Sequence, residues 1–277
     1  FPTRRSSDLG LSGDTLVGKT AIISKDVTEL NGNLVSEISA LGATNIEFEV
    51  GSELDNVHSN AFNGNLKIEK VDFTNCGELS YIGFYAFVSS KISEVDFSGC
   101  TKLKMVDVSA FESCEFLKKV SFENCKNLNQ IENCAFHLCR NLSEINFKGC
   151  TNLKGIPMSC FEECYLLESV DLSDLTSLEI VGAFAFHFCK SLKEIKFPQK
   201  AKKFEKIEEF AFNNCDNLKK LDLSHCSIKT LENEFVCGSK LEDLDLSNCK
   251  NLKKCNEITV LNTIDLRGCV NLNNFYE

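Results

Sequence analysis

A short glycine-rich segment near the start of the chain has the letters of a nucleotide-binding loop. Gly13-Asp-Thr-Leu-Val-Gly-Lys-Thr20 matches the P-loop pattern, in which backbone amides cradle phosphates and the lysine reaches the terminal ones. That chemistry requires a strand before the loop and a helix that begins at the lysine. Residues 4–10 (RRSSDLG) have no strand pattern, and Ala21-Ile-Ile23 resembles a strand where the helix should begin. We therefore predict neither a nucleotide cofactor nor an enzyme.

The 16 cysteines are the second group with chemical potential. Cys134 and Cys139, and likewise Cys160 and Cys164, are close enough in sequence to suggest zinc ligation. However, no second ligand pair follows at a matching spacing, and one cysteine of each pair belongs to a column that recurs along the chain. We therefore expect no metal site.

Two histidines occupy equivalent positions in the sequence, with an acid midway between them. His137 and His187 each follow a Phe, and Glu162 holds the same position halfway. In stacked coils the two imidazoles would lie about 10 Å apart, too far for one small cation to join them. The preferred interpretation is a solvated column. No Ser, Cys or carboxylate adjoins a His in a way that suggests nucleophilic catalysis.

Two interleaved repeats reveal the elements that position these residues. An Ala-Phe pair, or a near variant, recurs with its aromatic ring at Phe62, Phe87, Phe111, Phe136, Phe161, Phe186, Phe212 and Phe235. A Val-Asp-Phe or Leu-Asp-Leu triplet ends at Phe48, Phe73, Phe97, Phe122, Phe147, Leu172, Phe197, Leu223, Leu246 and Leu266. Both series have a period near 25 residues, which indicates a repeat architecture.

The repeat unit predicts a closed coil with two inward-facing sides. Phe-x-x-Cys-x-x-Leu-x-x-Ile occurs twice within one unit, from Phe122 to Ile131 and again from Phe136 to Ile145. The alternating triplet is typical of a half-buried strand, so about ten strands should form a parallel sheet roughly 45 Å long. We expect the Ala-Phe segment to be a single helical turn. Asparagines that tolerate left-handed backbone should form corners at Asn127, Asn141, Asn152, Asn217, Asn251 and Asn271.

Repeat register accounts for most of the cysteines. One column follows the strand triplet by three residues, at Cys76, Cys100, Cys125, Cys150, Cys226, Cys249 and Cys269. A second follows Ala-Phe, at Cys114, Cys139, Cys164, Cys189 and Cys215. A buried thiol can donate a weak hydrogen bond to a corner carbonyl. Disulfides between stacked neighbours would strain the coil because parallel Cβ vectors stay about 4.8 Å apart, whereas a disulfide prefers about 3.8 Å. We therefore predict structural thiols.

These motifs carry a family resemblance. Leu-x-x-Leu-x-Leu with Cys three residues on resembles a leucine-rich repeat, and Ile-x-x-x-Ala-Phe-x-x-Cys-x-x-Leu resembles the BspA-like (Treponema-type) repeats of surface proteins. The resemblance spans roughly residues 43–272. It implies a leucine-rich repeat solenoid with a concave parallel sheet and a convex side of short strands, loops and single helical turns. Only Pro198 stands where that family commonly has proline after the strand. The Cys corner used elsewhere resembles intracellular F-box-type adaptors.

The repeat boundaries suggest three parts. Residues 1–13 share no pattern with the rest and are expected to be a non-native or disordered leader. Residues 14–42 are expected to be a partial N-terminal cap, with a helix that begins at a capping box formed by Asp26 and Glu29 and ends at Gly42. Residues 43–277 form the solenoid, which we expect to be truncated at its C-terminus, with an atypical coil at Cys255–Leu261.

The exposed strand positions offer a candidate binding surface. Seven of the ten central strand residues are acidic, and the preceding column partly alternates in charge. The candidate partner-binding residues are Asp72, Glu94, Asp96, Lys119, Ser121, Glu144, Asn146, Asp171, Asp222 and Asp245. Two interpretations remain open. Like charges opposite one another in a sheet are unfavourable, so something must offset the acids. Either nearby lysines neutralise them and the triplet is simply a favoured strand sequence, or the face docks a basic partner.

Composition narrows the function classes. Forty acidic against 30 basic residues give a net charge of −10, which argues against a nucleic-acid partner. No apolar run approaches the length of a membrane helix. We predict a non-enzymatic module that binds a protein or glycan on its concave face. The resemblance implies a surface antigen or adhesin at the cell surface or secreted; the alternative is a cytoplasmic adaptor of the F-box substrate-receptor type.

Overall fold

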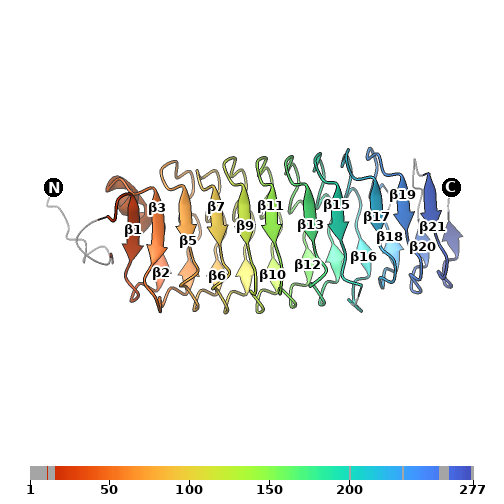
Figure 1. Cartoon of the computed structure of the whole chain (residues 1–277), viewed down its shortest axis with the longest axis horizontal. Coiled ribbons are helices and arrows are strands. Elements are labelled where there is room, and N and C mark those ends of the chain that lie inside the picture. Colours follow the sequence, from red (N-terminus) through yellow and green to blue (C-terminus); the bar gives the residue numbers. More distant parts are fainter. Residues whose placement is uncertain (1–10, 12–15, 200, 233, 256–261, 276–277) are drawn as a thin grey trace.

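The chain forms an elongated stack of coils (Figure 1). The computed structural model describes residues 11, 16–199, 201–232, 234–255 and 262–275. The leader expected at residues 1–13 therefore lies outside the described residues apart from Leu11, as does the atypical coil after Cys255. Each coil contributes one short strand to each of two parallel sheets, so the expected repeat solenoid is confirmed.

The first sheet contains all ten predicted strands. Its strands are β1 (Thr20–Ile23), β3 (Asn45–Phe48), β5 (Lys70–Asp72), β7 (Glu94–Asp96), β9 (Lys119–Ser121), β11 (Glu144–Asn146), β13 (Ser169–Asp171), β15 (Glu194–Lys196), β17 (Lys220–Asp222), β19 (Asp243–Asp245) and β21 (Thr263–Asp265). Pairing keeps equivalent positions opposite one another, with Asp72 facing Asp96 and Asp222 facing Asp245. In the described residues the ladder is interrupted twice, between β11 and β13 and between β15 and β17.

The second sheet lies on the other side of each coil and consists of two-residue strands, with its ladder interrupted between β10 and β12 in the described residues. These are β2 (Glu29–Leu30), β4 (Asn56–Val57), β6 (Tyr81–Ile82), β8 (Met105–Val106), β10 (Gln130–Ile131), β12 (Gly155–Ile156), β14 (Ile180–Val181), β16 (Lys206–Ile207), β18 (Thr230–Leu231), β20 (Lys254–Cys255) and β22 (Asn274–Phe275). Ile131 lies in β10 and Ile145 in β11, so the doubled sequence motif does form two sides of one coil.

The Ala-Phe segment is a run of turns, and the predicted single helical turn is wrong. Around Phe111, the N–H groups of Ala110 and Glu112 bond to carbonyls three residues back. The intervening N–H groups of Ser109 and Phe111 bond to carbonyls of the next coil. Ser109 and Ser113 have φ near +55°, and the equivalent residues of the other coils also have positive φ. Because alternate amides point between coils, an α-helical bonding pattern is impossible here.

Two columns of aromatic rings fill the interior. Phe97 and Phe122 stack at 5.2 Å between ring centroids, and Phe111 and Phe136 at 5.2 Å. The columns also touch edge to face, as between Phe97 and Phe111 at 6.3 Å. Such pairs contribute about 0.5–1.5 kcal/mol beyond burial. The regular ring spacing explains why Phe recurs along both columns, although Leu172, Leu223 and Leu246 take its place in the first.

The corner asparagines act through their side chains, so the left-handed interpretation of these positions is wrong. The Nδ2 of Asn127 donates to the carbonyl of Thr101 at 2.7 Å, and that of Asn152 to Lys126 at 2.7 Å, each in the preceding coil. Neither asparagine has positive φ. The left-handed corner is three residues earlier, at Asn124 (φ 64°) and Gly149 (φ 79°). The asparagines therefore form a ladder between coils.

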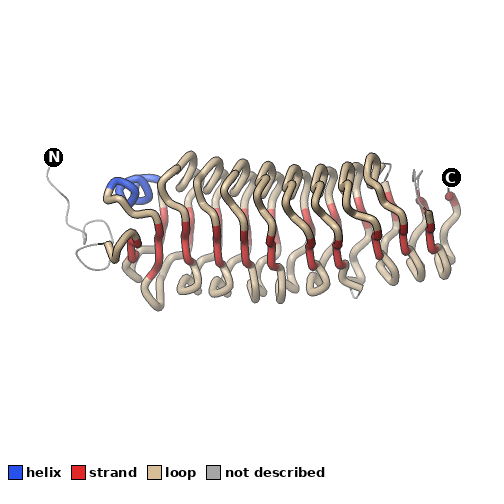
Figure 2. Tube along the Cα trace, turned by 45° about the horizontal axis from the view of Figure 1, so that its top comes forward, coloured by secondary structure: helices blue, strands red, loops and turns tan. Residues whose placement is uncertain are grey.

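At the N-terminal end a helix lies beside the first coils (Figure 2). Helix α1 (Gly32–Ala40) begins at Asn31, whose Oδ1 accepts the N–H of Asn33 and Leu34, each at 3.1 Å. The predicted start at Asp26 is wrong because Glu29 lies in β2. The stop at Gly42, with φ +90°, is confirmed. Since β1 and β2 already belong to the two sheets, the stack of coils begins before residue 43. The role of α1 as a cap on the stack stays a prediction.

Candidate functional site

The glycine-rich segment folds into a tight hairpin. Val17 and Thr20 exchange two backbone hydrogen bonds of 3.1 Å around Gly18, which has φ +64°. Thr20 begins strand β1, which pairs with β3. A P-loop would need a helix at this point, so the described part of the segment lacks the context for phosphate binding.

The two cysteine columns form hydrogen-bonded ladders, which confirms the predicted role of the thiols. The Sγ of Cys125 donates to the carbonyl of Phe97 at 3.1 Å, and that of Cys150 to Phe122 at 3.0 Å. The second column behaves in the same way. Its donors and their acceptor carbonyls in the preceding coil are Cys114 to Phe87, Cys139 to Phe111, Cys164 to Phe136, Cys189 to Phe161 and Cys215 to Phe186, at 2.9–3.3 Å.

Burial also makes these thiols chemically quiet. Desolvation raises the pKa of Cys76, Cys150 and Cys226 from 9.0 to about 12. A thiol held protonated is neither a nucleophile nor a good metal ligand. In the described residues no group of three or more His, Cys, Asp or Glu side chains is arranged to hold a metal ion.

The histidine column is largely buried, so its interpretation as solvated is wrong. His187 Nδ1 lies 2.9 Å from Glu162 Oε1, and His137 Nε2 lies 3.9 Å from Glu162 Oε2. His137 Nδ1 lies 3.4 Å from Glu112 Oε1. The four side chains are only 15–25% exposed. Because stacking brings the same position of successive coils into contact, acid and imidazole alternate and pair with each other.

The acidic column of the first sheet has a structural role that sequence reasoning missed. The Oδ1 of Asp96 accepts the N–H of Ser98 at 2.9 Å, two residues on, where the strand ends. Equivalent bonds form at Asp72, Ser121, Asn146, Asp171, Asp222, Asp245 and Asp265, at 2.8–3.3 Å. Asp, Asn and Ser all supply this acceptor. The sequence signal for this turn was therefore the occurrence of Asp, Asn and Ser at one repeat position.

One oxygen of four of the turn-forming carboxylates remains available. In the described residues Asp72, Asp96, Asp222 and Asp245 form no ion pair, although each turn uses only Oδ1. The neighbouring column, by contrast, is paired, with Lys119 at 2.8 Å from Glu144. The hydrogen bond from Lys119 to Glu144 raises the lysine's pKa, and Glu94 and Asp96 add to the effect.

The predicted binding residues all lie in strands of the first sheet. They run from Asp72 in β5 to Asp245 in β19, on the face that Figure 1 shows as one row of strands. Ser121 is buried, with 7% of its surface exposed, so the expectation that it contacts a partner is wrong. Its Oγ accepts the N–H of Glu123 at 3.3 Å in its own turn.

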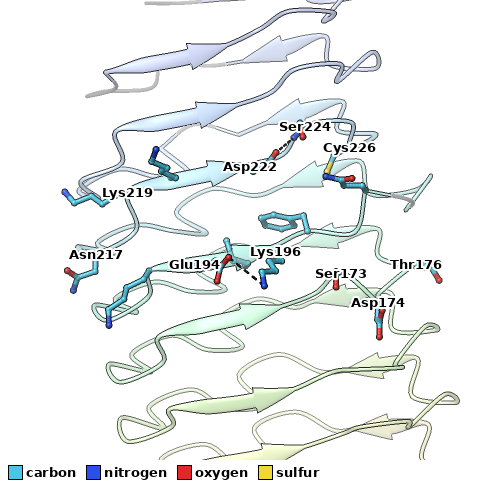
Figure 3. A pocket seen from close by; sticks show the side chains of 15 residues that line it. Ser173, Asp174, Thr176, Glu194, Lys196, Asn217, Lys219, Asp222, Ser224 and Cys226 are labelled. Atoms are coloured by element: carbon cyan, nitrogen blue, oxygen red, sulfur yellow. Dashed lines mark hydrogen bonds and ion pairs between the residues drawn. The ribbon is translucent and has the colours of Figure 1, made fainter.

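A groove crosses this face between β15 and β17 (Figure 3). Its volume is about 1130 Å³, and Asp222 is the predicted binding residue that lines it. Figure 3 shows Lys196 and Glu194 on one coil and Asp222 with Ser224 on the next. Sequence reasoning did not identify this groove.

The groove lies beside a local departure from the repeat. Lys196 replaces the turn-forming acid, and Pro198, which has no N–H, replaces the donor. Ala201 replaces the corner cysteine, whose thiol would bond to the preceding coil. This coil therefore lacks the turn bond within the coil and the thiol bond to the coil of β13. The ladder on its other side, between β15 and β17, is interrupted, as is the ladder between β11 and β13, where Asn146 keeps its turn.

Comparisons with known proteins agree with this architecture. A scan against protein families matches the BspA type leucine rich repeat region, in six copies, at residues 38–168 and 154–276. A search of curated proteins found no match.

Among solved structures, similar chains include a leucine rich repeat protein of T. pallidum (17% identity, TM-score 0.44, 91% of this chain and 92% of that one). The pneumococcal vaccine antigen PcpA is 18% identical with TM-score 0.37, over 78% of this chain and 69% of that one. A leucine rich cell surface protein of Faecalibacterium prausnitzii A2-165 is 18% identical with TM-score 0.36, over 92% and 78%. Since the family match spans nearly all of the described coils, the chain belongs to the BspA type leucine-rich repeat family.

Proposed function

We propose that the protein is a non-enzymatic interaction module that binds a protein partner carrying a basic segment on the face of its first sheet. The observation that supports this most directly is the row of carboxylates without ion pairs at Asp72, Asp96, Asp222 and Asp245. Each is fixed in direction by the bond from its Oδ1 to a turn amide. Fixed, outward charges are well suited to electrostatic recognition.

The electrostatics of the whole chain favour the same partner. A net charge of −10 attracts cationic segments over a Debye length of about 8 Å at physiological salt. In β5 and β7, Glu94 lies opposite Lys70 and Lys119, whereas Asp72 and Asp96 lie opposite each other. Lys119 is already bound to Glu144. An excess of negative charge therefore remains at this part of the face.

The turn geometry offers a sharp test, because asparagine keeps the turn acceptor and removes the charge, as Asn146 does naturally. The probe is a fluorescent lysine-rich peptide, followed by anisotropy. Asp72→Asn together with Asp96→Asn should weaken binding about 5- to 30-fold, at about 0.5–1 kcal/mol for each exposed charge pair. The unfolding temperature should not fall.

The matched control removes two charges elsewhere. Asp26 and Glu53 are exposed and lie outside both sheets. Asp26→Asn with Glu53→Gln should leave peptide binding nearly unchanged. Equal losses in both double variants would show that only net charge matters, and would count against the sheet face as the binding surface. A neutral glycan ligand would respond to neither pair.

We also propose a place at the cell surface or outside the cell, which the family resemblance implies. In the described residues no helix is long and apolar enough to cross a bilayer. Surface biotinylation of cells that make the full-length protein should label it without lysis. Labelling only after lysis would contradict this placement and favour the adaptor alternative.

A further inference from the structure

A small pocket lies at the corner that leads from the first sheet to the second. Its volume is about 280 Å³, and it is lined by Lys154, Thr176, Ser177, Glu179, Lys202 and Lys203. In two earlier coils this corner holds the asparagines whose amides bond to the preceding coil, Asn127 and Asn152. Ser177 has the equivalent position but reaches the preceding coil through its backbone N–H, which donates to the Thr151 carbonyl at 3.2 Å. The asparagine ladder is therefore interrupted where the pocket lies.

Two buried residues hold a pair of lysines at this corner. Ala201 and Phe204 are 2% and 0% exposed. The ring of Phe204 also stacks on that of Phe197, at 5.3 Å between centroids. Lys202 and Lys203 lie between these two buried residues and are themselves exposed. The corner therefore fixes the backbone from which both lysines reach the pocket.

The charge at this pocket is opposite in sign to that of the whole chain. Three lysines and one acid line it, whereas the chain has a net charge of −10. Lys203 Nζ lies 3.7 Å from Glu179 Oε1. Lys154 belongs to the adjoining coil, where its carbonyl accepts the N–H of Glu179 at 2.7 Å. Among the residues that the structure describes, neither Lys154 nor Lys202 forms an ion pair, so two ammonium groups remain unpaired.

Two unpaired ammonium groups beside a hydroxyl suit a doubly charged oxyanion. Lysine binds phosphate as a compact charge, and a phosphate monoester carries a charge of about −1.5 to −2 at pH 7. The hydroxyl of Ser177 has no hydrogen-bond partner within the described part of the chain and can donate to such a group. Pockets for whole small molecules begin at about 300 Å³, so this one suits a single charged group of a larger ligand.

We propose that this pocket binds a phosphate monoester carried by a ligand, with Lys154 and Lys202 supplying the opposite charge and Ser177 a hydrogen bond. Lys203 contributes less because it shares its charge with Glu179. None of the carboxylates proposed to bind a basic partner lines this pocket, so the inference goes beyond the proposed function. It requires no covalent step and no cofactor.

The test uses two probes, glucose 6-phosphate and N-acetyl-O-phosphoserine amide, each titrated against the whole chain at constant ionic strength. Nuclear magnetic resonance follows the lysine Cε signals and the backbone amide of Ser177. The signals of Lys154, Lys202 and Ser177 should shift and saturate at millimolar probe, whereas those of the exposed Lys104 and Lys126 should not. The probe that binds more tightly identifies a sugar or a peptide as the carrier. If neither probe gives a saturating shift, the proposal is wrong.

Glucose 6-sulfate separates a phosphate site from a general anion site. It has the same sugar and the same tetrahedral shape at the ester, but only one negative charge. It should bind at least about threefold more weakly than glucose 6-phosphate, because one ammonium group would remain unmatched. Equal binding of the two esters would overturn the assignment to phosphate.

Two double variants make the same change of charge at different places. Lys154→Gln with Lys202→Gln should weaken binding of the phosphate probe about 5- to 30-fold. Lys104→Gln with Lys126→Gln is the matched control, since both lysines are exposed and form no ion pair in the described residues, and it should change binding by less than about twofold. Equal losses would show an adventitious ion only, attracted by charge in general, and would overturn the proposal.

Ser177→Asn tests the shape of the pocket without changing its charge. Asparagine is the residue that earlier coils carry at this corner, so the variant should fold and keep its unfolding temperature. Its longer side chain should occupy part of the pocket and weaken probe binding at least about fivefold. A folded Ser177→Asn variant that binds the probe as tightly as the natural chain would contradict the proposed site, whereas the binding surface on the first sheet would be unaffected.

Discussion

The thiol of Cys125 donates a hydrogen bond of 3.1 Å to the carbonyl oxygen of Phe97 in the preceding coil. That oxygen also accepts the backbone N–H of Cys100 at 2.8 Å. One carbonyl therefore closes the corner of its own coil and joins the next coil to it. The same two-fold arrangement recurs at Phe111, Phe122, Phe136, Phe161 and Leu246.

Loss of one ladder thiol should be measurable. Cys125→Ala removes a fully buried sulfur and its bond, and should lower the free energy of unfolding by about 2 kcal/mol. Cys237 is half-buried and makes no such bond in the described residues, so Cys237→Ala is the control and should change stability by no more than about 0.5 kcal/mol. Urea titration followed by circular dichroism gives both values. Equal effects would show that the S–H bonds contribute nothing.

Alkaline pH should destabilise the protein steeply. Desolvation raises the pKa of Cys150 from 9.0 to about 12, so between these values the folded thiol keeps a proton that the unfolded thiol releases. Stability therefore falls as pH rises above 9, by up to about 1.4 kcal/mol per pH unit for each such thiol. The slope of unfolding free energy against pH, from 8 to 10.5, should be shallower in Cys150→Ala than in the natural chain. Identical slopes would contradict the assignment.

The turn-forming acids should tolerate amides but not alanine. In Asp96→Asn the amide oxygen can still accept the N–H of Ser98, and repulsion from Asp72 in the opposite strand disappears. We expect the unfolding temperature of Asp96→Asn, alone or with Asp171→Asn and Asp222→Asn, to stay equal or rise. Asp96→Ala loses the acceptor and should cost about 1 kcal/mol. Loss of folding in the triple asparagine variant would show that the charges themselves are required.

Close packing of neighbouring corners depends on Gly99. A Cβ at this position would lie 1.7 Å from the carbonyl oxygen of Thr74, which is backbone and cannot move aside cheaply. Gly99→Ala should therefore destabilise by more than about 3 kcal/mol. Gly77 lies at a neighbouring corner where a Cβ would meet no atom closer than 3.9 Å, and Gly77→Ala should change stability by less than about 1 kcal/mol. Similar values for both would contradict the coil spacing.

Much of this architecture could be predicted because stacking repeats one local pattern. The period placed all ten expected strands of the first sheet, and the cysteine columns pointed to their carbonyl partners. Features that depend on contact between coils were harder to predict from the sequence. Asn127 was mistaken for a left-handed corner because its partner, the Thr101 carbonyl, is 26 residues away. The burial of His137 depends likewise on acids in two other coils.

The groove illustrates a different limit. Pro198 and Lys196 were visible as departures from the repeat, but a single departure does not reveal whether the neighbouring strand compensates for it. The ladder between β15 and β17 is absent in the described residues, but so is the ladder between β11 and β13, where Asn146 keeps the repeat pattern. The structural effect of a deviation from the repeat therefore becomes clear only when the structure of the neighbouring coils is known.

The central claim is that the stacked coils are held together by reduced thiols that donate to main-chain carbonyls. The most direct measurement is a thiol titration of the protein unfolded in guanidinium without reductant. Nearly all 16 cysteines should react. Four or fewer reactive thiols, the number left by six disulfides, would contradict it, because disulfides would remove the S–H donors on which both ladders depend.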